Sequence, residues 1–294
     1  MPDFAPIADR IIAELIDEVA GQSEIDFSFQ FTERLTSRFW GVLLGMTPQE
    51  EELVVEAVRE MTPFFFIERT DEETILINGA TGRYLEIVAG AIERSLAAGG
   101  NALLESMAAE FDAIDLPGKP ESLGMSMAAN LIDGFHTAAL AAANTTYHLL
   151  RNPDALAAVR ADPSLVASAH AEGLRMSAPV IVTHRYALED FEYAGFQIPA
   201  GTAIAMVWAA GNRDPDVFDN PNQYQLTRVQ RADATFGGGI HICPGRNVAR
   251  MISMAVLRGI TQPGIRITLG DDFRWIVRST MRQPHRMPVT IERC

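Results

Sequence analysis

The stretch that decides the fold is residues 236–246, FGGGIHICPGR, a glycine-rich turn that presents one cysteine just before a helical pattern begins at Asn247. Backbone N–H groups of a tight turn and the N-terminus of a helix stabilise negative charge, and so favour a thiolate. Cys243 is therefore a candidate metal ligand. A thiolate bound to haem iron favours cleavage of the O–O bond, so oxygen chemistry is the first hypothesis for this loop.

Other interpretations of the loop fit less well. A phosphate-binding loop would end in Gly-Lys-Ser/Thr, and a dinucleotide-binding loop would need a third glycine where Ile242 stands. A zinc site would need a second pair of Cys or His residues at ligand spacing, which the sequence lacks. An ordinary buried cysteine after a glycine turn stays open as an alternative.

The loop resembles the signature of the cytochrome P450 family, Phe-Gly-x-Gly-x-His-x-Cys-x-Gly. The matching positions are Phe236, Gly237, Gly239, His241, Cys243 and Gly245. The resemblance implies the mainly α fold with a small β portion of soluble bacterial members of that family. It also implies a haem b cofactor whose iron takes Cys243 as its axial ligand, with His241 reaching a haem propionate.

A long helix is predicted from about residue 120 to residue 151. The resemblance places the family's oxygen-binding motif on residues 133–138, DGFHTA. The glycine of the motif and its first threonine, Thr137, are retained. The acid of the motif is replaced by His136, its first small residue by Asp133, and its second threonine by alanine.

Splitting dioxygen requires delivered protons, which is general-acid work. His136 suits a proton shuttle because histidine has an ordinary pKa near about 6.5, and Asp133, three residues earlier, would tune it. The alternative is that His136 is a satisfied helix histidine and Asp133 faces solvent or an arginine. Both alternatives stay open, and Thr137, His136 and Asp133 are the candidate catalytic residues.

Two further motifs follow this helix. Glu172 and Arg175 lie three residues apart on one helix face. They match the family's Glu-x-x-Arg, which by resemblance is a buried structural pair behind the haem; exposed, such a pair would contribute less than about 1 kcal/mol. A third member of that cluster is in doubt, because the expected step reads PNQY at 221–224. Arg185, on a predicted strand, matches an arginine that binds a propionate, with a surface arginine as the alternative.

The rest of the chain is predicted from periodicity and turn signals. The predicted helices cover residues 7–19, 29–44 and 48–61, the last with a capping box at Thr47, and lie near 83–97 and 101–111. Residues 64–82 are ambiguous, with a turn signal at Asn78-Gly79. Strands are predicted over 180–188 and 202–208, around a turn at 199–201. We expect a single haem domain over 1–294, helical over 1–176 and mixed over 177–294.

Composition limits the class of protein. A chain of 294 residues that is 48% hydrophobic buries a large core, and its net charge of −14 argues against nucleic acid as a partner. No stretch of about 18 uncharged apolar residues indicates a membrane span, and no signal peptide opens the chain. Two cysteines make no disulfide framework, which favours the cytoplasm.

Two functions are compatible with these residues. The first is a haem-thiolate oxidoreductase that inserts oxygen into a small hydrophobic substrate, driven by a ferredoxin or flavodoxin-like electron donor near Arg246 and Arg250, or by peroxide. The second is an inactive haem-binding relative that acts as a partner subunit. The family's N-terminal part has no counterpart in the sequence, so we expect an exposed side that a homo- or hetero-oligomer would cover.

Overall fold

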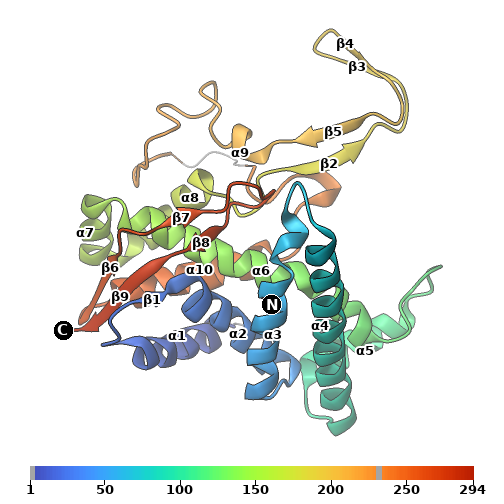
Figure 1. Cartoon of the computed structure of the whole chain (residues 1–294), viewed down its shortest axis with the longest axis horizontal. Helices are drawn as coiled ribbons and strands as arrows, with labels where there is room; N and C mark the ends of the chain where they lie inside the picture. Colours follow the sequence, from blue (N-terminus) through green and yellow to red (C-terminus); the bar gives the residue numbers. More distant parts are fainter. Residues whose placement is uncertain (1–3, 230–233) are drawn as a thin grey trace.

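The computed structural model describes residues 4–229 and 234–294, and most of these residues are helical (Figure 1). The α-helices of this part of the chain are α1 (Ala5–Val19), α2 (Arg34–Leu44), α3 (Pro48–Glu60), α4 (Asp71–Ala98), α5 (Ala102–Ala113), α6 (Leu123–Leu150), α7 (Pro153–Ala161), α8 (Val166–Met176), α9 (Trp208–Gly211) and α10 (Arg246–Thr261). Shorter helical turns are the π-helix η1 (Ser28–Glu33) and the 3-10 turns η2 (Thr62–Phe65), η3 (Pro163–Leu165) and η4 (Gly239–His241).

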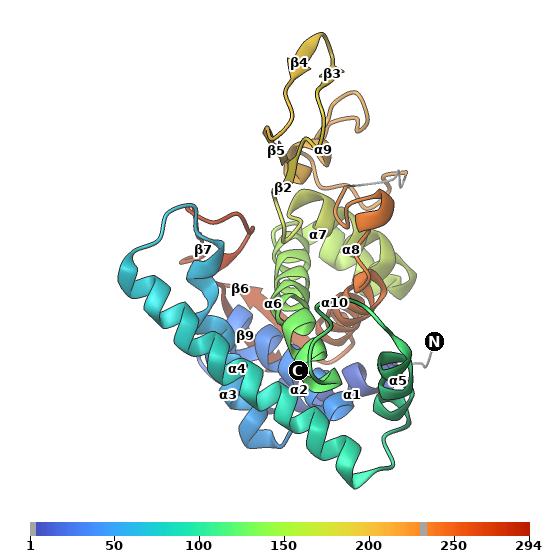
Figure 2. The same cartoon turned by 90° about the vertical axis from the view of Figure 1, so that its right-hand side faces the viewer.

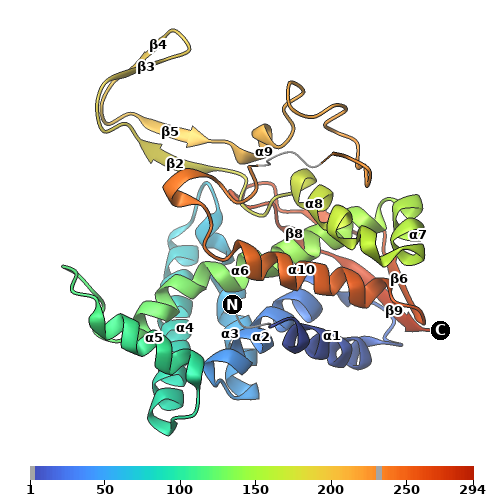
Figure 3. The ribbon, with the colours of Figure 1, turned by 180° about the vertical axis from the view of Figure 1, so that it is seen from behind.

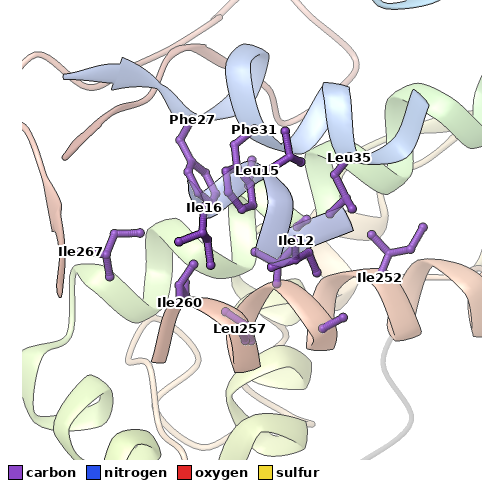
Figure 4. Close-up of a cluster of buried hydrophobic side chains, with 14 of the residues drawn as sticks. Ile12, Leu15, Ile16, Phe27, Phe31, Leu35, Ile252, Leu257, Ile260 and Ile267 are labelled. Atoms are coloured by element: carbon purple, nitrogen blue, oxygen red, sulfur yellow. The ribbon is translucent and has the colours of Figure 1, made fainter. Parts of the chain in front are cut away.

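Helix α6 is the centre of the helical body, and it packs against α4, α8 and α10. On the other side of α10 lies α1, whose apolar residues recur at helical spacing and point into a shared core (Figure 4). The two helices approach closely at Gly259, where a Cβ atom would lie 2.5 Å from Ile12 Cγ2. Ile12, Ile16, Leu257 and Ile260 fill this core, so residues from both ends of the chain are buried together.

The strands form small antiparallel sheets. They are β1 (Ile25–Asp26), β2 (Thr183–Tyr186), β3 (Phe191–Tyr193), β4 (Phe196–Ile198), β5 (Ala203–Met206), β6 (Ile265–Leu269), β7 (Arg274–Trp275), β8 (Pro284–Arg286) and β9 (Pro288–Arg293). One sheet has the order β1-β9-β6 and packs on the core, while β2–β5, β3–β4 and β7–β8 are two-stranded. The β2–β5 and β3–β4 pairs form an arm that projects from the helical body (Figures 1 and 2).

The capping box predicted at Thr47 is confirmed: its side chain accepts from the N–H of Glu50, and the Glu50 carboxylate accepts from the N–H of Thr47. The ambiguous segment 64–82 is largely helical, and the turn signal at Asn78-Gly79 does not produce a turn. A second capping box, at Thr70, starts α4 at Asp71, and the helix runs through these two residues. Buried side chains at helical spacing along α4 outweigh the local turn preference.

Two other boundaries differ from the sequence predictions. The helix expected from residue 29 begins as the π-turn η1 and becomes α-helical only at Arg34. The predicted turn at 199–201 does not join β2 directly to β5, because the β3–β4 hairpin lies between them, with its tip at Ala194 and Gly195 in left-handed conformations. No helix in the described part of the chain is long and apolar enough to span a bilayer.

Candidate active site

The cysteine loop is closed by a hydrogen bond from the N–H of Cys243 to the carbonyl oxygen of Phe236, at 2.9 Å. Gly237 and Gly239 within it have φ values of +67° and +62°. Residues with a side chain rarely adopt this left-handed backbone conformation, so glycine is required at both positions of the motif. The turn delivers Cys243 to the start of α10 at Arg246.

Cys243 is half-buried, and basic groups surround its turn. Arg246 donates from Nη1 to the carbonyl oxygen of Cys243 at 3.0 Å, and the Arg250 guanidinium lies 5.1 Å from the centre of the Phe236 ring. The N-terminus of α10 adds partial positive charge on the same side. Positive charge therefore lies beside the turn that carries Cys243.

The donor set fits haem. Among the described residues no group of three His, Cys, Asp or Glu side chains could hold a metal ion, so Cys243 is a lone donor. A lone thiolate suits an iron that arrives with four porphyrin nitrogens of its own. The exposed side chains of Ile240 and Ile242 lie on either side of His241 and offer apolar surface to a flat macrocycle.

The two residues predicted to bind propionates lie on separate elements. His241 is exposed at the end of η4. Arg185 is half-buried on β2, with Nη1 donating to the carbonyl oxygen of His184 at 2.8 Å, and no carboxylate of a described residue pairs with it. Figure 3 shows α10 running along α6, with the cysteine loop at its N-terminal end on the side of the molecule that carries β2 and β5. No described contact joins His241 to Arg185.

Glu172 on α8 is the centre of a buried ion-pair network. Arg175 donates from Nε to Oε2 and from Nη2 to Oε1, each at 2.8 Å, and Arg228 donates from Nε to Oε1 at 3.0 Å. The Glu172 side chain is only 1% exposed. Burial by itself raises the pKa of Glu172, but the hydrogen bonds from Arg175 and Arg228 outweigh it and hold this pKa below the ordinary 4.5.

The same arginines fix the long loop before the cysteine. Arg175 donates from Nη1 to the carbonyl oxygens of Asn212 and Pro221, at 2.9 and 2.8 Å. Arg228 donates to those of Asp219 and Gln223. Residues 212–229 contain neither helix nor strand. Hydrogen bonds from these arginines, and not those of regular secondary structure, therefore hold them against α8.

On α6 the three candidate catalytic residues differ in burial and in their partners. Thr137 is half-buried, and its Oγ1 donates to the carbonyl oxygen of Asp133 at 2.5 Å. The Asp133 side chain is exposed. His136 is buried, its ring stacked on Phe65 with centroids 5.3 Å apart and planes 4° apart, and its Nε2 lies 3.4 Å from Gln283 Oε1. This placement favours the alternative of a buried helix histidine beside an exposed aspartate.

Burial lowers the pKa of His136 to about 4, more than the contact with Gln283 raises it. Its Nδ1 is buried without a partner. The ring is therefore neutral at pH 7 and joins α6 to η2 and to the segment before β8.

Sequence reasoning missed Arg228, Phe65 and Gln283. The sequence contains an indication of Arg228, because it is the first basic residue after positions 221–224, where the third member of the Glu172 cluster was expected. No local pattern indicates the contacts of His136 with Phe65 and Gln283, because these residues are far apart along the chain and meet only through tertiary packing.

Comparison with known proteins gives concordant results. The family model for cytochrome P450 matches residues 164–262, which include Glu172, Arg228 and the cysteine loop. The 6-deoxyerythronolide B hydroxylase of Saccharopolyspora erythraea is 30% identical over 291 residues, covering 98% of this chain and 70% of that protein. The vitamin D(3) 25-hydroxylase of Pseudonocardia autotrophica is 32% identical, covering 99% of this chain and 70% of that protein.

Solved structures agree on the fold. The P450BioI complex with a fatty-acid-ligated acyl carrier protein has a TM-score of 0.86 at 24% identity, covering 98% of this chain and 74% of that one. The ligand-free P450 monooxygenase TamI has a TM-score of 0.78 at 28% identity, covering 97% and 69%. The cysteine loop carries glycines at its left-handed positions, Glu172 is buried with two arginines, and hydroxylase relatives match nearly all of this chain. The chain therefore belongs to the cytochrome P450 family and is a monooxygenase of that type.

Proposed function

We propose that Cys243 ligates the iron of haem b and that the protein hydroxylates a hydrophobic molecule. The observation that carries this proposal is the closed loop at residues 236–243, in which two left-handed glycines deliver one half-buried sulfur to the start of α10. When bound, haem supplies the electron-transfer and dioxygen chemistry that hydroxylation requires.

The chain's own residues hold the cofactor. The N-terminus of α10 and the Arg246 guanidinium stabilise the negative charge at Cys243. Arg185 and His241 bind the propionates, since each has polar N–H groups without a carboxylate partner among the described residues. Glu172, Arg175 and Arg228 fix the loop before the cysteine and so act on the cofactor through the main chain.

The substrate is inferred to be a hydrophobic molecule with few charged groups. Two relatives at 30% and 32% identity are named as a 6-deoxyerythronolide B hydroxylase and a vitamin D(3) 25-hydroxylase. These relatives do not support the alternative of an inactive partner subunit, because they are named as hydroxylases.

Partners are proposed on charge and exposure. An electron donor of the ferredoxin or flavodoxin class would dock beside Arg246 and the exposed Arg250. The arm carries exposed Tyr186, Leu188 and Phe196, a surface that favours cover by a homo- or hetero-oligomer. The two free cysteines fit a cytoplasmic location.

The direct test is the absorption spectrum of the reduced protein with carbon monoxide, after expression with haem supplied. We expect a strongly red-shifted Soret band that is absent in Cys243→Ala. The matched control is Cys294→Ala, which removes the exposed second cysteine and should leave the band unchanged.

Two outcomes would contradict the proposal. If Cys243→Ala keeps the red-shifted band, another group is the ligand. If the folded wild-type protein binds no haem, the family fold in this chain has no haem-thiolate chemistry.

A further inference from the structure

Two half-buried arginines beside α6 and α8 have no ion-pair partner among the described residues. Arg213 follows α9 in the loop before the cysteine, and Arg282 lies between β7 and β8. The buried carboxylate nearest to this loop, that of Glu172, already pairs with Arg175 and Arg228. The two arginines therefore add positive charge that this network does not neutralise.

Hydrogen bonds fix both arginines on the short segment that follows α8. Arg213 donates from Nη2 to the carbonyl oxygen of Met176 at 2.7 Å and from Nη1 to Asn222 Oδ1 at 2.8 Å. The backbone N–H of Arg282 donates to the carbonyl oxygen of Pro179 at 2.7 Å. Two stretches far apart in the sequence thus meet at one place, each bringing a guanidinium group.

Helix α6 holds the same segment from the other side. Asn144 donates from Nδ2 to the carbonyl oxygens of Ser177 and Arg282, at 3.0 and 2.8 Å. One helical turn further on, His148 Nε2 lies 2.8 Å from Ser177 Oγ. The main chain at Arg282 is therefore held on both sides, by α6 and by the segment after α8.

The Arg282 guanidinium keeps its donors open. It lies 3.9 Å from the centre of the Trp275 ring, and none of its N–H groups has a hydrogen-bond acceptor in the described part of the chain. Trp275 itself makes edge-on contacts with Tyr147 and Phe273. Stacking holds the plane of the guanidinium and leaves the N–H groups at its edge for an acceptor from outside the chain.

The surroundings of the two arginines are electrostatically positive. Burial and then the charge of Arg213 lower the pKa of Arg282, and burial and then the charge of Arg175 lower that of Arg213. Burial, followed by the charges of Arg213 and Arg282, lowers the pKa of His148 to about 3. The carboxylate of Asp214 accepts from the main-chain N–H two residues later and forms no ion pair with a described arginine.

We propose that the guanidinium groups of Arg213 and Arg282 bind a phosphate group, supplied as inorganic phosphate or by a small phosphate monoester. A phosphate group carries about 1.5 to 2 negative charges at pH 7, so one group balances both guanidinium charges, whereas a carboxylate balances one. The bound group joins the loop before the cysteine to the segment between β7 and β8. This inference goes beyond the proposed haem chemistry and does not depend on it.

The experiment is calorimetric titration of the haem-loaded protein with inorganic phosphate at pH 7 and constant ionic strength. We expect saturable binding in wild type. Arg282→Gln should weaken it at least about tenfold, because charge-assisted hydrogen bonds are the stronger class, and Arg282→Lys should keep part of the affinity, since it keeps the charge and loses the planar fork. The control is Arg274→Gln, an exposed arginine on β7 paired with Asp272, which should bind phosphate like wild type.

A second measurement uses the wild-type protein alone and so does not depend on how the variants fold. Phosphate should protect Arg213 and Arg282, but not Arg274, from modification by phenylglyoxal, as read by mass spectrometry of peptides. Glycerol 3-phosphate in place of inorganic phosphate distinguishes the two sources, since the tighter of the two identifies a monoester or the free ion.

Three results would overturn the inference. They are the absence of saturable phosphate binding in wild type, equal binding in wild type and Arg282→Gln, and modification of Arg282 at the same rate with and without phosphate. Acetate that binds as tightly as phosphate at equal ionic strength would contradict the charge argument for a phosphate group.

Discussion

The network at Glu172 and residues 133–137 of α6 differ in whether their charged and titratable groups have partners. In the network at Glu172 every charge is buried and paired. Both Glu172 oxygens accept hydrogen bonds from arginines, and the same arginines also donate to carbonyl oxygens. In the second, His136 Nδ1 is buried without a partner and the Asp133 carboxylate is exposed without one. A satisfied network holds one conformation, whereas a polar group without a partner adds no such constraint.

The largest expected effect comes from breaking the paired region. Glu172→Gln leaves the Arg175 and Arg228 guanidinium groups buried without their anion, so the free energy of unfolding should fall by about 3–5 kcal/mol. Urea denaturation followed by circular dichroism measures this loss. The control is Glu14→Gln in the exposed Arg10–Glu14 pair, which should cost less than about 0.5 kcal/mol. A loss at Glu172 below about 1 kcal/mol would mean that the network does not hold the loop.

The next effect lies in the dependence of stability on pH. Burial lowers the pKa of His136 to about 4, below the ordinary 6.5, so the unfolded chain binds more protons than the folded one between these values. The folded state should therefore lose about 1.4 kcal/mol per pH unit as pH falls from 6.5 toward 4 because of this ring. In His136→Gln this part of the slope should vanish.

The difference between variant and wild type is the quantity to measure, because other groups also titrate. Burial raises the pKa of Glu33 to about 8, which contributes stability that grows as pH falls and opposes the histidine. Urea unfolding at pH 7, 6 and 5 gives both slopes. An unchanged slope in His136→Gln would show that the ring is not held neutral in the folded state.

Local sequence predicted the paired region better than the unpaired one. The i,i+3 spacing of Glu172 and Arg175, the glycine positions of the cysteine loop and the capping box at Thr47 are short-range patterns, and each has a local physical cause. Such patterns fix backbone conformation within a few residues. Thr137 was identified differently, through the resemblance of residues 133–138 to the family's oxygen-binding motif.

What sequence could not predict depends on long-range packing. The stacking of His136 on Phe65 joins positions 71 residues apart, and its contact with Gln283 spans 147. The run of α4 through Asn78-Gly79 likewise depends on Ile77, Ala80 and Tyr84 being buried against neighbouring helices. Arg228 reaches Glu172 from a loop without regular structure, where no periodicity indicates which side chain turns inward.

The smallest effect is expected at Arg250, whose guanidinium lies over the Phe236 ring of the cysteine loop. Arg250→Gln removes the guanidinium from the Phe236 ring, and an exposed cation–π contact contributes only about 0.5–1 kcal/mol, so the unfolding midpoint should move slightly. Because Arg250 is exposed, its larger consequence is electrostatic: reduction by a ferredoxin should slow, and should depend less steeply on salt than in wild type. The control is Arg266→Gln, an exposed arginine paired with Glu292 on β9. Equal salt dependence in Arg250→Gln and wild type would place the electron donor on another face, while the red-shifted Soret band should persist because Cys243 and its turn are unchanged.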